Sequence, residues 1–104
     1  MRNIRTKSLD VSPKVRKAVY KRDSIDDYPN CVTCGNPGYH DMSHIVKRSK
    51  SGLGIPENLI NQCRECHEKM ESGDEGLMQR AQEHLKHYYP GWTIDSEELR
   101  YKRE

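Results

Sequence analysis

The sequence predicts a small α+β domain that is held together by a structural zinc ion. Only 33% of the 104 residues are hydrophobic and none is Phe, so the chain cannot bury a large apolar core and needs another source of stability. All four cysteines fall in two C-x-x-C pairs, which can hold a metal. Segments of helical and of strand periodicity flank and separate the pairs. We expect one domain over residues 1–104, with a basic arm at 1–11, a zinc-clasped core and its leading helix at 12–73, and a C-terminal helix and tail at 74–104.

The pairs Cys31/Cys34 and Cys63/Cys66 have the internal spacing of zinc knuckles. Four thiolates can hold one tetrahedral Zn²⁺, and such an ion contributes about 10 kcal/mol or more of apparent folding free energy. The segment between the pairs, residues 35–62, is longer than the roughly 15 to 20 residues of a zinc ribbon. We therefore expect the zinc to clasp the ends of a larger unit that carries the chemistry.

Two disulfides are the alternative use of four cysteines. No apolar run typical of a secretory signal opens the sequence, and no stretch has the ~18 apolar residues of a membrane span. We expect an intracellular, cytoplasmic protein without membrane contact, in which thiols stay reduced and the spacing favours metal.

Before the first pair, the sequence predicts a helix and then a loop. Ser12 is a good N-cap, and Pro13 fits the first helical position, where its missing N–H is not needed. Apolar residues then recur at helical spacing, so the helix is expected to end by Asp23. Residues 26–30 include Pro29 and are expected to form a loop.

Between and after the pairs, the pattern changes from strand to helix. Residues 39–46 predict a strand, 47–56 a loop, and 58–61 either a short second strand or an irregular turn. The second pair should lead straight into a helix with His67 in or near its first turn. A longer helix is predicted over 74–89.

The C-terminal segment begins after Pro90 and Gly91, which end that helix. We expect Trp92 and Ile94 to cover the core and residues 97–104 to form a charged tail.

The charge is unevenly distributed although the net charge is only +2. Residues 1–22 hold eight Lys or Arg against one acid, Asp10, and the loop after His44 adds three more basic residues. This segregation could form one basic face for nucleic acid, or simply a solvated surface.

Three polar residues between and beside the knuckles are candidates for chemistry. His44 ends the predicted strand, and an imidazole accepts a proton near neutral pH. His67 follows a zinc cysteine directly, so its ring should point away from that metal and could bind a second cation. Asn58 could brace the loop that holds His44 or reach that cation. Each has a plainer interpretation: a packed histidine, a helix cap or zinc ligand, and a turn residue.

The order and spacing of these residues resemble a known family. The matching blocks are Cys31-x-x-Cys34-Gly, Ser43-His44-Ile45-Val46, Gly54-Ile55-Pro56-Glu57-Asn58-Leu59 and Cys63-x-x-Cys66-His67. They resemble the zinc-clasped HNH endonucleases that are common in phages and mobile elements, over residues 12–73. The resemblance implies a ββα-metal core, flanked here by the N-terminal and C-terminal helices.

The resemblance also implies an activity and residue roles. It suggests a metal-dependent DNA endonuclease that hydrolyses phosphodiester bonds, with His44 as the general base, Asn58 orienting the loop that bears it, and His67 as a ligand of a catalytic Mg²⁺, Mn²⁺ or other divalent cation. A nickase, or a phage DNA-processing enzyme that works beside packaging proteins, falls within what it suggests.

The sequence departs from the family pattern at Ser43, where many members carry Asp or His as a second cation ligand. A hydroxyl is a poor ligand compared with a carboxylate. Ser43 could bind through water, or Asp41 or His40 could replace it, and Glu71 lies one helical turn after His67. We expect Asp41 to be the best substitute.

For DNA, we expect phosphate contacts that read no sequence, made by Lys47, Arg48, Lys50, Arg16 and Lys17. The alternative function is a non-catalytic zinc module that binds nucleic acid or a protein partner. A redox role for the C-x-x-C pairs is disfavoured because no thioredoxin-like βαβ pattern surrounds them.

Overall fold

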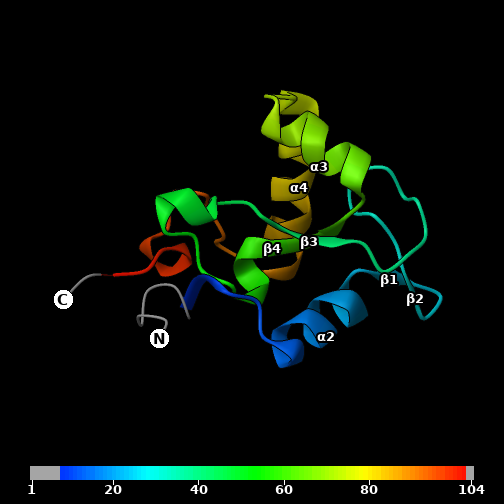
Figure 1. The fold of residues 1–104 in the computed structure, drawn as a ribbon, viewed down its shortest axis with the longest axis horizontal. Helices are drawn as coiled ribbons and strands as arrows, with labels where there is room; N and C mark the ends of the chain where they lie inside the picture. Colours follow the sequence, from blue (N-terminus) through cyan, green and yellow to red (C-terminus); the bar gives the residue numbers. More distant parts are fainter. Residues whose placement is uncertain (1–7, 103–104) are drawn as a thin grey trace.

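The computed structural model describes residues 8–102 and shows an α+β fold around one central antiparallel hairpin (Figure 1). Strand β3 (Asp41–His44) pairs with β4 (Leu59–Gln62). Figure 1 shows α2 on one side of this hairpin and α3 and α4 on the other. These helices span Pro13–Arg22, Arg64–Glu71 and Glu75–Tyr88. The expected fold class is confirmed.

Helix α2 begins and ends where the capping residues predict. The Ser12 hydroxyl accepts a hydrogen bond from the Val15 N–H at 3.2 Å, and Asp23 caps the other end. Val19 is the helix's only fully buried apolar residue. Most of the docking is polar instead, because the Arg22 guanidinium donates to the carbonyl oxygens of Pro56 and Leu59, each at 2.6 Å.

The loop expected at 26–30 is partly a second hairpin. Strand β1 (Ser24–Ile25) pairs with β2 (Tyr28–Pro29) across a two-residue turn. Both turn residues, Asp26 and Asp27, have positive φ angles of 51° and 64°, which is the geometry that matches the twist of paired strands. No Asn-Gly or Asp-Gly dipeptide announces this turn, so the sequence did not reveal it.

The central hairpin resolves the ambiguity at 58–61, because those residues lie in or next to strand β4. Strand β3 is shorter than the predicted 39–46. Between the strands the chain forms two short 3₁₀ helices, η1 (Arg48–Lys50) and η2 (Pro56–Asn58). The helices α3 and α4 occupy the predicted positions on either side of Gly73.

The apolar core lies between the hairpin and α4. Its buried members are Ile45, Val46, Ile60, Met70, Ala81, Leu85, Trp92 and Leu99. Ile94 packs against this cluster as expected. The Trp92 ring also donates a hydrogen bond to the Glu57 carbonyl at 2.7 Å, which ties the chain after α4 to the loop before β4.

The two ends of the described chain differ from the simple arm and tail that the sequence suggested. Leu99, in η3 (Glu97–Leu99), is buried, and the Tyr101 N–H donates to the Ser51 carbonyl at 2.8 Å. Leu9 is likewise buried and Ser8 accepts a hydrogen bond from Gly54. Both segments therefore pack on the loop between β3 and β4. The rest of the expected arm, residues 1–7, lies outside the described residues.

Within residues 8–102, no helix has the length and apolar character needed to cross a membrane.

Candidate metal centre and active-site cleft

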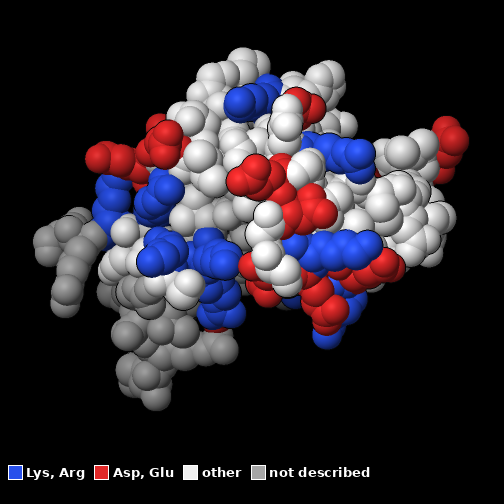
Figure 2. Space-filling model, turned by 90° about the horizontal axis from the view of Figure 1, so that it is seen from above, with Lys and Arg blue, Asp and Glu red and all other residues white. Residues whose placement is uncertain are grey.

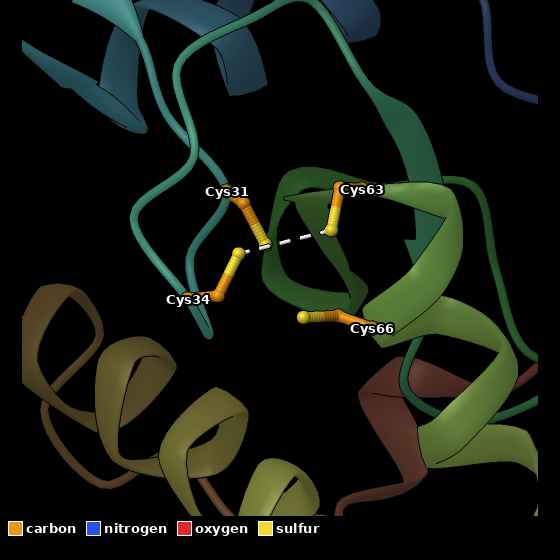
Figure 3. A group of neighbouring side chains, drawn as sticks. All are labelled: Cys31, Cys34, Cys63 and Cys66. Carbon is orange, nitrogen blue, oxygen red and sulfur yellow. Dashed lines mark hydrogen bonds between the residues drawn. The ribbon is translucent and has the colours of Figure 1, made fainter.

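The four cysteines converge at one point (Figure 3). Cys31 and Cys34 lie on the loop after β2, Cys63 caps the start of α3 and Cys66 lies in its first turn. Their sulfur atoms all lie within 4.8 Å of one another, and none forms a disulfide. Sulfurs bound at about 2.3 Å around a tetrahedral zinc are about 3.8 Å apart. The Cys34–Cys63 sulfur separation is 3.8 Å, so the four thiols fit a zinc ion.

The thiols affect one another's protonation. Burial tends to raise the pKa of Cys31, but hydrogen bonds from Thr33 and from backbone N–H groups outweigh it and lower the pKa to about 6. Burial and contact with the neighbouring thiols raise the pKa of Cys66 to about 12. Thiolates this close repel one another, and a bound dication would offset that repulsion.

The first knuckle contains a tight turn in which one residue has a left-handed backbone conformation. The Gly35 N–H donates to the Cys31 carbonyl at 2.8 Å, and Gly35 has a φ angle of +81°. That left-handed conformation favours glycine. The turn brings the sulfur of Cys34 back toward that of Cys31.

A cleft of about 740 Å³ lies beside the zinc cluster, and most of the predicted chemistry opens into it. Its lining includes His44 from the end of β3, His67 and Glu71 from α3, Asp41 from the start of β3, Arg16 from α2, and Lys47 and Arg48 from the following loop. The two imidazoles that the sequence singled out therefore share one cleft.

His44 is held in one orientation by the chain ahead of α2. Its Nε2 lies 2.9 Å from the carbonyl oxygen of Leu9. A carbonyl oxygen can only accept, so Nε2 carries the proton and Nδ1 keeps a lone pair. Burial lowers the pKa of His44, with the positive charge of Arg48 and the proximity of His67 adding to the effect and the Leu9 hydrogen bond opposing it. The ring is therefore neutral at neutral pH and able to accept a proton.

His67 lies between two carboxylates. Its Nε2 is 3.0 Å from a Glu71 oxygen, and its Nδ1 is 3.7 Å from an oxygen of Asp41. The Arg64 guanidinium competes for the same Asp41 oxygen at 3.0 Å. Among the described residues, the cysteines are the one group of three or more His, Cys, Asp or Glu side chains placed to hold a metal ion. The cleft offers oxygen and nitrogen donors for a cation but does not enclose it.

Ser43 does not reach the cleft. It is completely buried, and its hydroxyl donates to the Gln62 side chain at 2.8 Å on the opposite face of β3. Of the alternatives that the sequence left open, Ser43 as a cation ligand does not fit this arrangement. His40 is also turned away, because its Nε2 lies 2.8 Å from the Asn36 carbonyl.

Asn58 braces the loop after His44 but makes no contact with the cleft. Its side chain accepts from the Val46 N–H at 2.8 Å and donates to the carbonyl oxygens of Val46 and Leu53. Gly52 lies inside this arrangement, where a Cβ would overlap the Val46 carbonyl. Asn58 is buried and all its hydrogen-bonding groups are used, so its role is positional.

The basic residues named for DNA lie in three places. Arg16, Lys47 and Arg48 line the cleft, and Arg48 also contacts Asp10 at 2.6 Å. Lys17 faces a neighbouring groove, and Lys50 is exposed outside both. Figure 2 shows Lys and Arg interspersed with Asp and Glu on the face seen from above, so that face is mixed rather than uniformly basic.

Two features escaped the sequence analysis. One is the Leu9 carbonyl that orients His44, a backbone atom with no sequence signature. The other is a buried network in which Asp23 binds Arg22 at 2.7 Å and His84 at 2.7 Å. Arg22 and Asp23 form an adjacent pair of opposite charges next to a helix end, which could have hinted at it. His84, on α4, belongs to this network.

Comparison with known proteins gives one finding. Residues 31–73 match the family model described as HNH endonuclease. Searches among curated proteins and among solved structures return no match. The matched segment contains both cysteine pairs, His44, Asn58 and His67. The resemblance seen in the sequence is thus confirmed over residues 31–73, the segment that matches the HNH endonuclease model.

Proposed function

We propose that the protein is a metal-dependent DNA endonuclease that uses the cleft between β3 and α3. The observation that carries the proposal is that His44 and His67 open into the same cleft, together with carboxylates and basic side chains. A general base, donors for a hard cation and groups that bind phosphate are the parts that phosphodiester hydrolysis requires.

His44 acts as the general base in this proposal. The Leu9 carbonyl holds the proton on Nε2, so Nδ1 is the atom that takes a proton from the attacking water. The lowered pKa keeps this nitrogen unprotonated at neutral pH. Asn58 acts through the loop that it braces, as a positioning residue.

A catalytic Mg²⁺, Mn²⁺ or other divalent cation would be held by His67 with Asp41, which lies beside its Nδ1, or with Glu71, which lies beside its Nε2. When bound, it would neutralise charge on the scissile phosphate and on the leaving oxygen. Magnesium commonly keeps several waters and binds through one or two protein groups plus substrate phosphate, which suits an open set of donors. The zinc ion at the cysteines would remain structural.

Arg16, Lys47 and Arg48 would bind phosphates on either side of the scissile bond, with Lys17 and Lys50 further out. Such contacts are independent of sequence and weaken with added salt. Action as a nickase or in phage DNA processing beside packaging proteins, in a host cytoplasm, is supported by the family resemblance alone.

A non-catalytic zinc module that binds nucleic acid or a protein partner is the second candidate. The observation in its favour is that Arg64 occupies Asp41 while Ser43 is buried, which leaves His67 with less support for a cation than the family pattern has.

Nicking of supercoiled plasmid distinguishes the two candidates. We expect zinc-loaded wild-type protein with added Mg²⁺ or Mn²⁺ to convert plasmid to the open circular form, and His44→Ala to slow this by about 10²- to 10⁴-fold. His87→Ala is the matched control, since His87 is an exposed histidine on α4. If the wild type is no faster than His44→Ala with any of several divalent cations, the enzyme proposal fails. Retained DNA binding would then support the second candidate.

A further inference from the structure

A second groove, of about 720 Å³, lies beside the cleft. It runs along α2 toward the β1–β2 hairpin. Val11 and Arg16 line both hollows, so the groove continues directly from the proposed active site. A polymer whose phosphate lies at His44 and His67 could extend into it.

Two tyrosines, Tyr20 and Tyr39, line the groove. Tyr39 is 65% exposed, and Tyr28, which contacts Tyr39 but does not line the groove, is 49% exposed. Tyr39 makes edge-to-face contacts with Tyr20 and Tyr28, with ring centroids 5.0 and 5.6 Å apart. The Tyr20 hydroxyl donates to the His40 carbonyl at 2.8 Å, which anchors the group. Three tyrosines thus form a pre-arranged cluster at the surface rather than part of the core.

Basic side chains also line the groove. They are Arg16, Lys17 and Lys21, all from α2, and Asp27 is the one acid among the described residues that line it. Aromatic rings and cations in one groove match the two parts of a nucleotide, since a base stacks on an aromatic ring and a phosphate binds a cation.

We infer that this groove binds unpaired nucleotides next to the scissile phosphate, so that the preferred substrate is DNA with a single-stranded segment. This inference rests on the proposed function for the position of the scissile phosphate. In a continuous duplex the base faces are already stacked on each other and only the phosphates face outward. A duplex could use the lysines but not the tyrosines, whereas an unpaired strand uses both.

Binding can be measured apart from cleavage by fluorescence anisotropy, using His44→Ala protein with zinc bound and no other cation added. The probes are a labelled single strand, a blunt duplex, and the same duplex with a single-stranded overhang. We expect Tyr39→Ala to weaken binding of the single strand and the overhang by about 5- to 150-fold, the effect of losing one stacked base, and to leave the blunt duplex unchanged.

Two further variants sharpen this result. Tyr39→Trp keeps an aromatic face and should retain the preference for unpaired DNA. Tyr88→Ala is the matched control, because Tyr88 is a 45% exposed tyrosine on α4 outside the groove. An equal loss on all three probes, no loss on any, or a Tyr39→Trp variant as weak as Tyr39→Ala would overturn the inference.

A second copy of the chain is the other occupant to be tested. If sedimentation shows a wild-type dimer that Tyr39→Ala converts to a monomer, the groove is a self-association surface and the inference is wrong. The plasmid assay keeps the two proposals apart. If the wild type does not cleave plasmid but Tyr39→Ala still weakens binding of unpaired DNA, only the endonuclease proposal fails. If the wild type cleaves plasmid but Tyr39→Ala binds unpaired DNA as the wild type does, only the inference about the groove fails.

Discussion

The group of four cysteines and the cleft both use residues at the start of α3, but they arrange their metal-binding side chains differently. Cys66 belongs to a closed set of four identical donors, whose sulfur atoms lie within 4.8 Å of one another. The next residue, His67, faces an open set of two carboxylates, one of which Arg64 already contacts. The protein alone can complete the first site. The second leaves positions open for water or substrate. The two arrangements therefore suit a structural metal and, under the proposed function, a catalytic one.

The largest expected effect concerns the closed site. Cys66→Ser should leave most of the domain unfolded, because a structural zinc contributes about 10 kcal/mol or more of apparent folding free energy. His67→Ala, one residue away, should keep the zinc and the fold. Far-UV circular dichroism and zinc content measure both. Equal loss of structure in the two variants would contradict the division between scaffold and cleft.

The next effect concerns the polar network that docks α2. Asp23 has a completely buried side chain that holds Arg22 and His84, so Asp23→Ala should cost about 3 to 5 kcal/mol of unfolding free energy. Urea denaturation measures this, with the exposed Glu83→Ala as control at within about 0.5 kcal/mol.

The same carboxylate should make the protein sensitive to acid. Burial favours a raised pKa, but the hydrogen bonds from His84 and Arg22 outweigh it and lower the pKa of Asp23 below 3.8. A lowered pKa stabilises the fold above the unfolded value, and that contribution is lost as pH falls through the folded value. If the Asp23→Ala variant has the same unfolding free energy as the wild type at pH 7, the network does not stabilise the fold.

A smaller effect is expected on Mn²⁺ affinity, and it distinguishes the two residues of β3, Asp41 and Ser43, that the sequence suggested as cation ligands. Asp41→Asn should weaken Mn²⁺ binding by about 10- to 100-fold, the range seen when a partner of a metal-binding histidine is removed. Ser43→Ala should leave Mn²⁺ affinity unchanged, because its hydroxyl binds Gln62 in the interior. Electron paramagnetic resonance titration of the zinc-loaded protein gives both affinities. The reverse ranking would restore Ser43 as a ligand.

The smallest effect is on pH dependence. The pKa of His44 is lowered from 6.5, mainly by burial, so the base stays active at pH 6.5 and is lost as pH falls through its lower folded value. Arg48 contributes to the lowering through its charge. Arg48→Gln should therefore move the acidic limb of the rate profile upward, toward 6.5. If the pH at the midpoint of the acidic limb stays the same or falls, the charge of Arg48 does not lower the pKa of His44.

The closed site could be predicted from the sequence and the open one only in part. C-x-x-C spacing fixes the geometry of a knuckle locally, so Cys31 and Cys66 could be assigned without coordinates. Alternation along a strand places the side chains of Asp41 and Ser43 on the same face, yet of these two only Asp41 lines the cleft. Asp41 is the first residue of β3 and lies at the edge of the hairpin, where alternation no longer decides the direction of a side chain.

The fold was predictable where signals were local, such as the Ser12 cap and the helix after Cys63. It was not predictable where distant segments meet. Nothing in the residues 8–10 indicates that they will pack on the loop after β3, and Leu99 in a charged stretch gives little sign that it is buried. Such contacts depend on tertiary placement and not on propensity.

The hydrogen bond between His44 and the Leu9 carbonyl has a practical consequence. The atom that sets the tautomer of the base lies more than twenty residues ahead of the segment that matches the family. An excised 31–73 fragment would retain every motif residue and all four cysteines, yet its imidazole would lack this partner. Under the proposed function, proteolytic removal of the residues up to Leu9 would therefore lower the nuclease activity while leaving the motif residues intact.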